Sequence, residues 1–355
     1  MQIGACQSPV RMKALVLGAT LVLASSVALA TPIEHAFTFE DVNWTSGGVG
    51  GIGDQGSGTI SVSGIDGPVI QAFFYWHGIV HPGSGTYDNP DFSFEGNAVT
   101  GDLLGEGSTN CWGNGISRGY RADVTDFING DGDYSFTGLA DGNNHNVNGA
   151  SLIVVYEGPD AATRSDLVIF DGNDSSNPEG FAGQLDGWNA VLSPINYGGG
   201  PVMAEFHVAD GQSGASFGDG SVNFSTPSGS VVIPDAPDLW SGTSTPTEGN
   251  SRAPNGELWD IHAFDITGAF GGVMGPVALN LQAMTTGNFD CKALIALALD
   301  LEVGSAPLPG EPPPPPPPPP PPVEPISVPV NSAWGLGLLS LMLMLAGAVV
   351  IRRQC

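Results

Sequence analysis

The chain has 355 residues, a formal net charge of −27 at pH 7, and only 9 Lys and Arg against 36 Asp and Glu. So acidic a chain repels phosphate backbones, which excludes nucleic acid as a partner. It contains 52 glycines and 30 prolines, which disfavour long helices and favour turns.

The first thirty residues have the pattern of a secretory signal peptide. Arg11 and Lys13 precede an apolar stretch, residues 14–27, and Ala28 and Ala30 form a small-residue cleavage site. We therefore expect cleavage after Ala30 and an exported product. A retained membrane anchor is the alternative, which the shortness of the apolar stretch disfavours.

The start of translation is open between two methionines. Eleven residues precede Met12, which is unusually long for the charged start of a signal peptide. Met12 followed by Lys13 is the more ordinary start, and Met1 is the alternative.

Two cysteines remain in the exported body. Cys6 leaves with the signal peptide and Cys355 is the last residue, so Cys111 and Cys291 are left. In an oxidising compartment they are a candidate disulfide, which would close a loop of about 180 residues. Two buried free thiols are the alternative.

The body, residues 31–305, consists of short apolar runs separated by Gly, Asn, Asp and Ser. The run 201–210 alternates apolar and polar residues with period two, as half-buried strands do. The run 151–157 is continuously apolar and β-branched, which is typical of a strand buried on both faces. The predicted strands are 36–40, 59–63, 69–76, 92–94, 121–128, 134–137, 151–157, 167–170, 201–210, 231–233, 258–266, 277–283 and 292–303.

These strands, with no predicted helix between them, indicate an all-β fold: an antiparallel β-sandwich or jelly roll. No internal repeat is evident in the sequence. We expect one domain, with two stacked sandwiches as the alternative.

Two stretches of the body resemble a recurring domain of bacterial and archaeal surface proteins. They are "YRADVTDFINGDGDYSFTGL" (120–139) and "GASLIVVYEGPDAATRSDLVIFDG" (149–172). The resemblance implies a β-rich surface protein and names no activity.

An acidic turn is the candidate metal site. Asn129, Asp131 and Asp133 stand at alternate positions, like the first ligands of a calcium loop. The loop would need Gly and Glu where Tyr134 and Ala140 stand. A hairpin turn between two strands is the alternative, so we expect no cofactor beyond a weak structural calcium ion.

The segment "HGIVH" places His77 and His81 four residues apart. On a strand these side chains share a face but lie roughly 13 Å apart, too far to chelate one ion. No zinc-protease motif is present, because no Glu follows the first His.

Lys292 is the only lysine left after removal of the signal peptide. Surface sandwiches can carry an isopeptide crosslink between Lys and Asn, and Lys292 opens the last predicted strand. An ordinary solvated lysine at a strand end is the alternative and the one we expect.

No nucleophile elbow, P-loop or dinucleotide fingerprint occurs, so no catalytic residues are assigned. A pair of carboxylates suited to glycoside hydrolysis is defined by its separation in space, which the sequence does not give. Exposed tryptophans would stack on sugars, whereas buried ones are core. The candidates are Trp44, Trp112, Trp188, Trp240 and Trp259.

A proline-rich linker, residues 306–327, follows the body. Its eleven consecutive prolines, 312–322, form a stiff polyproline II rod of roughly 34 Å. We interpret it as a spacer that holds the body away from a surface. A ligand for a proline-recognition domain is the alternative.

Residues 333–351 carry no charge and are long enough to cross a bilayer as a helix of about 28 Å. Two arginines follow at once, which places this end in the cytoplasm and the body outside. Before any processing, the chain would be anchored in the inner membrane.

The C-terminal segment 328–355 resembles the IPTL-CTERM sorting signal of Gram-negative envelope proteins. The matching residues are Val328, Pro329, Trp334, Gly335, Arg352 and Arg353, whereas Val330 and Asn331 depart from the family pattern. The resemblance implies that an exosortase, a membrane-embedded protease, recognises the tail, cuts near the motif and passes the protein to the surface or medium.

These observations predict a non-enzymatic cell-envelope protein with an adhesion, matrix or structural role. A secreted carbohydrate-binding or glycan-hydrolysing protein is the alternative, with surface glycans as partners.

Overall fold

The computed structural model describes the body of the chain between Thr31 and Ala306. The described segments are residues 31–53, 56–80, 90–107, 116–139, 145–175, 187–211, 219–236, 239–242, 258–284 and 292–306. Their regular elements are β-strands and three short 3-10 turns, and every pairing between strands is antiparallel. The predicted all-β, antiparallel class is therefore confirmed.

Seventeen strands lie in these segments. In chain order they are β1 (Thr31–Gly53), β2 (Gly58–Val62), β3 (Val69–Val80), β4 (Asp91–Phe94), β5 (Asn97–Thr100), β6 (Asp102–Gly107), β7 (Ile116–Asp123), β8 (Gly132–Thr137), β9 (His145–Tyr156), β10 (Ser165–Ser175), β11 (Asn189–Tyr197), β12 (Val202–Ala209), β13 (Ser221–Thr226), β14 (Gly229–Ile233), β15 (Trp259–Asp265), β16 (Gly275–Met284) and β17 (Ala293–Leu301). The 3-10 turns are η1 (Thr125–Phe127), η2 (Ala161–Thr163) and η3 (Thr267–Phe270).

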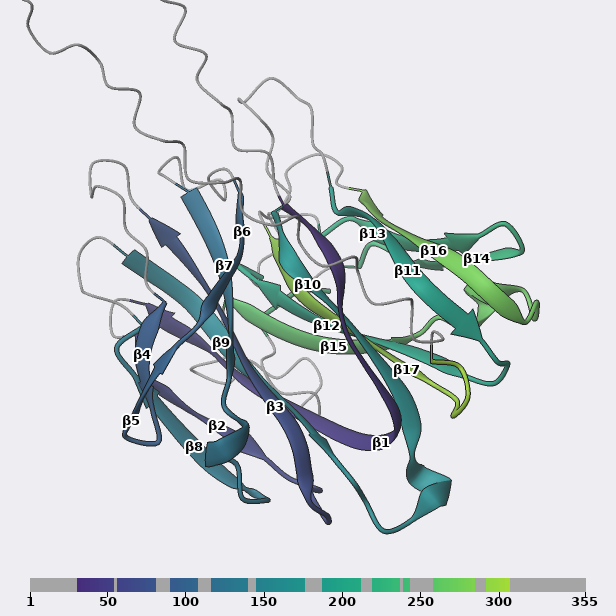
Figure 1. Cartoon of the computed structure of the whole chain (residues 1–355). Helices are drawn as coiled ribbons and strands as arrows, with labels where there is room; N and C mark the ends of the chain where they lie inside the picture. The colour runs from purple at the N-terminus through teal and green to yellow at the C-terminus, as the bar shows by residue number, and fades with distance from the viewer. Residues whose placement is uncertain are drawn as a thin grey trace, which may run out of the picture. The chain divides into compact units, whose positions relative to one another are not determined.

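The strands stack in four layers (Figure 1). The longest ladder has the order β15-β12-β17-β10-β1-β9-β3-β7-β6, and its middle strand β1 is bent, so its first half pairs with β10 and its second half with β9. The bend makes two facing halves. Inner sheet I contains the second half of β1 with β9, β3, β7 and β6, and inner sheet II contains the first half of β1 with β10, β17, β12 and β15.

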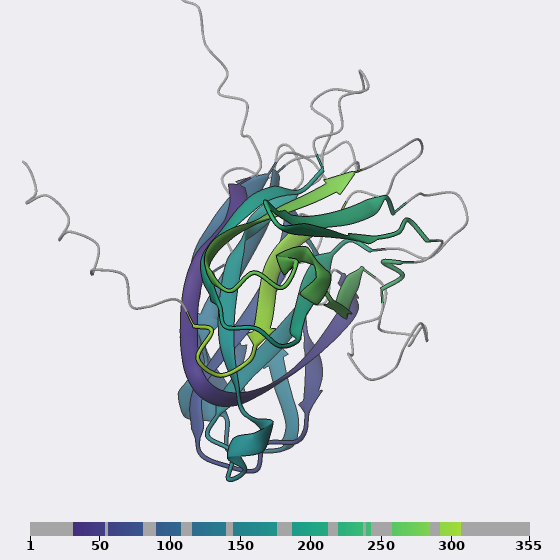
Figure 2. The ribbon, with the colours of Figure 1, turned by 90° about the vertical axis from the view of Figure 1, so that its right-hand side faces the viewer.

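Each inner sheet is covered by a four-stranded sheet. Outer sheet I (β2-β8-β4-β5) packs on inner sheet I, and outer sheet II (β11-β16-β13-β14) packs on inner sheet II. In Figure 2 the green strands of outer sheet II lie in front of the inner strands.

An aromatic core lies between each outer sheet and its inner sheet. In core I, the rings of Phe74 and Trp76 are fully buried, 5.7 Å apart. In core II, Phe206 and Trp240 have centroids 5.4 Å apart, and Trp188 packs edge-on against Trp240 at 5.5 Å. Burial of such rings is the largest apolar contribution to stability in both halves.

A third, central core separates the two inner sheets. Strand β3 sends Phe74 and Trp76 into core I and the alternate residues Phe73 and Tyr75 into the central core. Both faces of the strand are therefore buried, which explains its unbroken apolar run.

The two halves of the chain repeat one topology. The first half has the strand orders β1-β9-β3-β7 and β2-β8-β4-β5, and the second half has β10-β17-β12-β15 and β11-β16-β13-β14. Taken in chain order, each strand of the second half occupies the place of its counterpart in the first, with β6 as an addition to the first half.

The same corner closes both halves. Asp123 ends β7 and Thr125 begins η1, just as Asp265 ends β15 and Thr267 begins η3, with Val or Ile between them. Each threonine hydroxyl donates to its aspartate at 2.6 Å and accepts a backbone N–H from the neighbouring strand, β3 or β12, at 2.9 Å. The expectation that the chain has no internal repeat is therefore wrong, because the repeat is one of topology and a three-residue corner.

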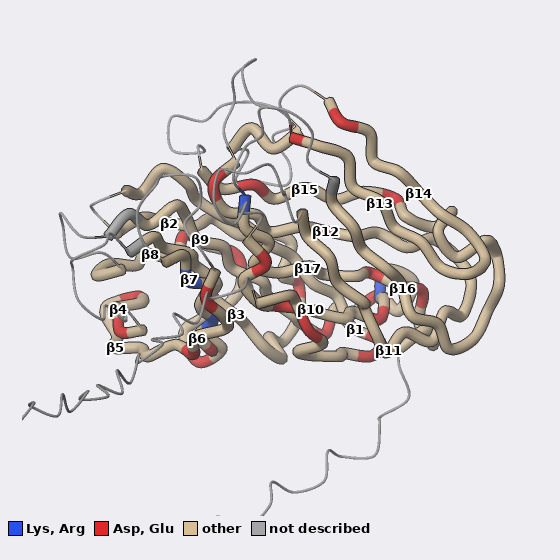
Figure 3. The backbone as a smooth tube through the Cα atoms, turned by 90° about the horizontal axis from the view of Figure 1, so that it is seen from above, with Lys and Arg blue, Asp and Glu red and all other residues tan. Residues whose placement is uncertain are grey.

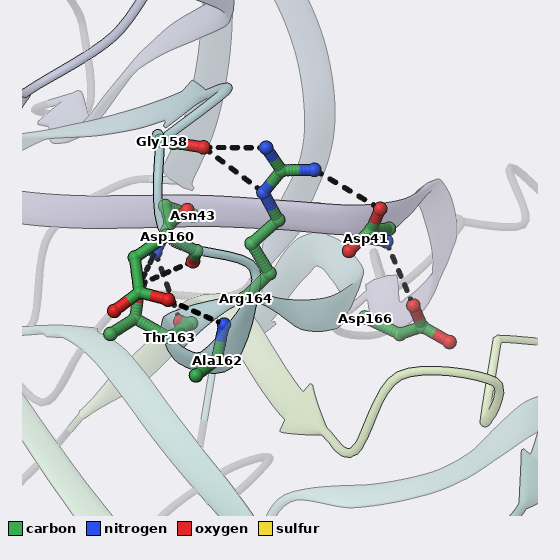
Figure 4. A network of polar contacts seen from close by, with 8 residues as sticks. All are labelled: Asp41, Asn43, Gly158, Asp160, Ala162, Thr163, Arg164 and Asp166. Atoms are coloured by element: carbon green, nitrogen blue, oxygen red, sulfur yellow. Dashed lines mark hydrogen bonds and ion pairs between the residues drawn. The ribbon is translucent and has the colours of Figure 1, made fainter.

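The bend of β1 is held by one buried carboxylate (Figure 4). Asp41 has a left-handed backbone with φ of 53°, and its N–H donates to Asp166 Oδ1 at 2.9 Å. The other oxygen, Oδ2, accepts the N–H groups of Gly304 at 2.8 Å and Ala306 at 2.6 Å. Asp166 is 1% exposed, so it joins the bend, the start of β10 and the exit from β17.

A second set of contacts surrounds the same bend. The Arg164 guanidinium donates twice to the carbonyl of Gly158, at 3.0 and 2.6 Å, and pairs with Asp41 at 3.1 Å. Asn43 donates its side-chain N–H to the carbonyl of Thr163 at 2.9 Å. These bonds fix the β9–β10 connection against β1, although the exposed ion pair itself adds little stability.

Several strands extend beyond, or lie outside, the sequence prediction. Strand β1 runs to Gly53 where only 36–40 was predicted, and the predicted strand 121–128 is instead the end of β7 followed by η1. The strands β5, β6, β11 and β13 were not predicted. Strands β5 and β6 are short, and Pro194 interrupts β11. In β13 only Val222 and Phe224 alternate with polar residues, which is too brief a pattern to mark a strand.

Asp166→Ala is expected to lower the free energy of unfolding by about 3 kcal/mol, because three backbone N–H groups lose a charged acceptor. Urea unfolding followed by tryptophan fluorescence measures the loss, and Asp166→Asn should fall between the variant and the wild type. Asp160→Ala, which removes only the cap of η2, is the matched control and should cost about 1 kcal/mol. Equal losses in the two alanine variants would contradict the role of Asp166.

Candidate functional site

The predicted metal turn ties two strands of outer sheet I together. Asn129 and Asp131 lie between η1 and β8, and Asp133 is the second residue of β8. Asp131 accepts the backbone N–H of Ile65 at 2.7 Å, and Asp133 accepts the hydroxyl of Ser61. Across the described segments, no group of three or more His, Cys, Asp or Glu is placed to hold a metal ion. Weak calcium binding at this turn stays a prediction.

The tryptophans that the described segments contain are mostly core residues. Trp188, Trp240 and Trp259 are fully buried, and Trp44 is half-buried with its Nε1–H donated to Asp300 at 3.0 Å. Of the two alternatives, a place in the core therefore holds for Trp188, Trp240 and Trp259, and none of these three offers an exposed platform for sugars. Trp112 lies outside the described residues.

His77 is buried in β3. Its Nδ1 lies 2.9 Å from Asn148 Oδ1, and Asn148 donates its N–H to Asp210 at 3.0 Å on inner sheet II. Because the Asn oxygen accepts, His77 carries its proton on Nδ1. Its Nε2 has no hydrogen-bond partner among the described residues, and burial lowers the pKa of His77 to about 4. His81 lies outside the described segments.

A Ser–His–carboxylate arrangement occurs in the central core. His207 Nδ1 lies 2.9 Å from Ser151 Oγ, and His207 Nε2 lies 3.3 Å from Glu205 Oε1, which also accepts the hydroxyl of Ser46. These residue types in this order resemble a nucleophilic triad. Ser151 and His207 are 0% exposed, so a substrate cannot reach the hydroxyl, and the contacts instead join the two inner sheets.

Further polar bonds cross the central core in the same way. They connect Trp44 with Asp300, Asn148 with Asp210, Tyr75 with Asp171, and Asn173 with Ser117. Cores I and II rely on apolar and aromatic contacts, whereas the central core combines such contacts, including the stacked rings of Phe37 and Phe73, with these polar pairs.

One cleft opens beside the central core, with a volume of about 480 Å³. At its base, Arg121 from β7 forms an ion pair with Asp171 from β10, which also accepts the Tyr75 hydroxyl at 3.1 Å. The Arg121 guanidinium lies over the ring of Phe37, 4.6 Å from its centroid, a favourable cation–π contact. The cleft is lined by Thr31, Pro32, Glu34, His35, Ala36, Phe37, Asp102, Leu103, Leu104, Arg121 and Asp171.

Burial governs ionisation in this cleft. It raises the pKa of Asp171, which Arg121 opposes only in part, and it raises the pKa of Tyr75 well above its ordinary value, with Asp171 adding to the effect. Burial alone would lower the pKa of Arg121, but the Asp171 carboxylate and its hydrogen bond raise it. Burial lowers the pKa of His35.

The charge balance of the cleft decides what it can bind. Its one arginine is already paired, while Glu34 and Asp102 on the rim are exposed. Acidic residues also dominate the rest of the described fold (Figure 3). The cleft therefore suits neutral hydroxyl-rich or cationic ligands and disfavours anions.

Arg121 and Asp171 carry no motif or spacing that marks them as a site in the sequence. The two are 50 residues apart and meet only because the inner sheets face each other. The scarcity of basic residues was the one feature of the sequence that could have pointed to this pair. The body from Thr31 to Leu308 has five basic residues against 34 acidic ones. A basic residue within a predicted strand is therefore a candidate for a buried ion pair.

The remaining predicted sites lie outside the described residues. These are the cleavage-site residues Ala28 and Ala30, the candidate disulfide Cys111–Cys291, and the sorting-signal residues Val328, Pro329, Trp334, Gly335, Arg352 and Arg353. No helix within the described segments is long and apolar enough to cross a membrane, and the predicted span 333–351 is not among them.

No protein family, curated protein or solved structure matches the chain. The likenesses of the tail and body to surface-protein families therefore stay predictions.

The low pKa of His77 predicts a loss of stability in acid. The unfolded imidazole takes up its proton near pH 6.5 and the folded one only near pH 4, so stability falls as the pH drops through this window. The shift corresponds to about 3 kcal/mol at most. His77→Gln cannot be protonated, so its stability should lack this pH dependence. The difference in unfolding free energy between wild type and variant, measured by urea titration, should therefore become about 3 kcal/mol smaller at most when the pH is lowered from 7 to 4.

His35→Gln is the matched control, because His35 is only partly buried and should contribute less. If the difference in unfolding free energy between wild type and His77→Gln does not change with pH, His77 is not a neutral, buried imidazole in the folded protein.

Proposed function

We propose that the chain is a non-enzymatic protein of the cell envelope. It is exported by its signal peptide, anchored in the inner membrane by residues 333–351, and passed to the surface or medium after an exosortase-type protease acts on its tail. The body serves adhesion, matrix or structural roles at the end of the proline-rich linker.

The finer fold assignment belongs to the same proposal. We class the body as two stacked antiparallel β-sandwiches of jelly-roll type, each made of one inner and one outer sheet. The repeated strand order and the separate aromatic cores support this class.

Strand β1 begins at Thr31, so the proposed cleavage after Ala30 would leave every described strand intact.

The observation that carries the proposal is the way the linker would leave the body. The last strand, β17, lies between β10 and β12 in inner sheet II and is buried along most of its length. Its exit is held by Asp166 through the N–H groups of Gly304 and Ala306. A force applied along β17 through the linker would have to break its hydrogen bonds to β10 and β12 at the same time and not one after another. Such a strand resists mechanical unfolding, as a body attached by its C-terminal end requires.

The triad-like cluster in the described part of the chain suits a structural role better than a catalytic one. The Ser151, His207 and Glu205 cluster is buried, and its polar atoms bond across the inner sheets. These hydrogen bonds hold the two inner sheets together, which accounts for the cluster without a catalytic role.

The proposal is tested by following the full chain in a Gram-negative host that has an exosortase. Immunoblots of inner membrane, outer membrane and medium should find the wild-type body at the surface or in the medium, shortened at both ends. Trp334→Ala should accumulate uncut in the inner membrane. Leu338→Ala is the matched control in the same apolar segment and should behave like wild type. A cytoplasmic, full-length wild-type protein would overturn the proposal.

The Arg121 cleft favours carbohydrate binding as the second candidate function. It offers carboxylates, an imidazole and the exposed Leu103 around a volume of about 480 Å³, although no tryptophan lines it. On a glycan array, with and without calcium, Glu34→Gln and Asp102→Asn should weaken any binding about tenfold or more through lost charged hydrogen bonds. Both side chains are exposed, so folding should be unaffected. Binding that both variants retain would place the sugar elsewhere.

A further inference from the structure

The last lysine of the body is buried against an aspartate. Lys292 immediately precedes β17 in inner sheet II and is 2% exposed. Its Nζ lies 3.2 Å from Asp219 Oδ1 and 2.8 Å from the main-chain oxygen of the same residue. Asp219 stands two residues before β13 of outer sheet II and is 5% exposed. The expectation that Lys292 is a solvated strand end is therefore wrong.

The surroundings of this pair are aromatic and fixed. The backbone N–H of Trp240 donates to Asp219 Oδ2 at 3.1 Å, which leaves Oδ1 facing the amine. The Trp240 ring packs against His262 at 5.8 Å and against Trp188 at 5.5 Å. The amine and the carboxyl are thus held in contact at the end of core II, largely shielded from water.

Such burial changes what the two groups can do. A bond between the two groups requires only that the amine pass one proton to the carboxyl across their 3.2 Å contact. Held in contact, the two react as if at a very high effective concentration. Exclusion of water also slows the reverse hydrolysis.

We propose that Lys292 and Asp219 become joined by an isopeptide bond. The lone pair of the neutral Nζ attacks Asp219 Cγ, the C–N bond forms, and the C–OH bond of the acid breaks. The hydroxyl leaves with one amine proton as water, so the step needs no oxidant, reductant or cofactor. The bond would link outer sheet II to inner sheet II and make the second half of the body resistant to separation of its layers.

The arginines and lysines of the chain allow a direct test on the mature protein purified from the exporting host. After denaturation and reduction, trypsin should cut an unlinked chain behind Arg164, Arg252 and Lys292, which separates 165–252, 253–292 and a peptide starting at Ala293. In the linked chain, Lys292 is not cut. The peptide 165–252 should instead stay joined to the one starting at Ala253, with a mass about 18 Da below their sum for the lost water.

Fragmentation of the joined peptide should place the bond between Asp219 and Lys292. Asp219→Ala and Lys292→Met should each abolish it, and Asp235→Ala, a nearby carboxylate that binds only the N–H of Gly220, should leave it in place. Complete cutting behind Lys292 in the wild type, at the unmodified mass, would overturn the proposal whether or not the variants fold. A joined peptide that persists in Asp219→Ala would overturn Asp219 as the partner.

Discussion

The architecture depends on the carboxylate of Asp166. Strand β1 can belong to both inner sheets only if it turns at Asp41, and Asp166 holds that turn through the Asp41 N–H. The same carboxylate holds the exit of β17 through two further N–H groups. One buried acceptor therefore stabilises two features. These are the bend that lets inner sheets I and II face each other, and the segment that follows β17. A neutral or misplaced acceptor would leave these N–H groups without a partner of equal strength.

The three cores differ in how they bring sheets together. Cores I and II are aromatic, and apolar contacts alone would tolerate many side-chain packings of similar total volume. The central core contains pairs whose two members come from different inner sheets, such as Ser151 with His207 and Tyr75 with Asp171. Buried polar groups tolerate few partners and geometries, so these pairs favour one register between the halves. The arrangement explains how two copies of one topology can pack face to face without sliding.

Strands with a local alternation of apolar and polar residues could be predicted from the sequence. Strand segments shaped by the close packing of two backbones could not. Period two correctly located strands such as β12 and β17, because their alternate residues face different layers. The second half of β1 was missed because its glycines give no such pattern. The structure supplies the reason for Gly47: a Cβ there would lie 2.4 Å from the carbonyl oxygen of Ser61. Glycine is required at that point by the packing of outer sheet I, which the local sequence does not encode.

The same distinction applies to charge. Composition predicted an acidic exterior, but it did not indicate that the few cations would be paired. Each of the four basic residues in the described segments forms an ion pair: Arg118 with Glu106, Arg121 with Asp171, Arg164 with Asp41, and Lys292 with Asp219. These four positive charges are thus used to join segments of the fold, which leaves the described surface dominated by negative charge. Such a surface keeps neighbouring copies apart in solution. For a body on the proposed proline-rich linker, this repulsion would favour display as separate units.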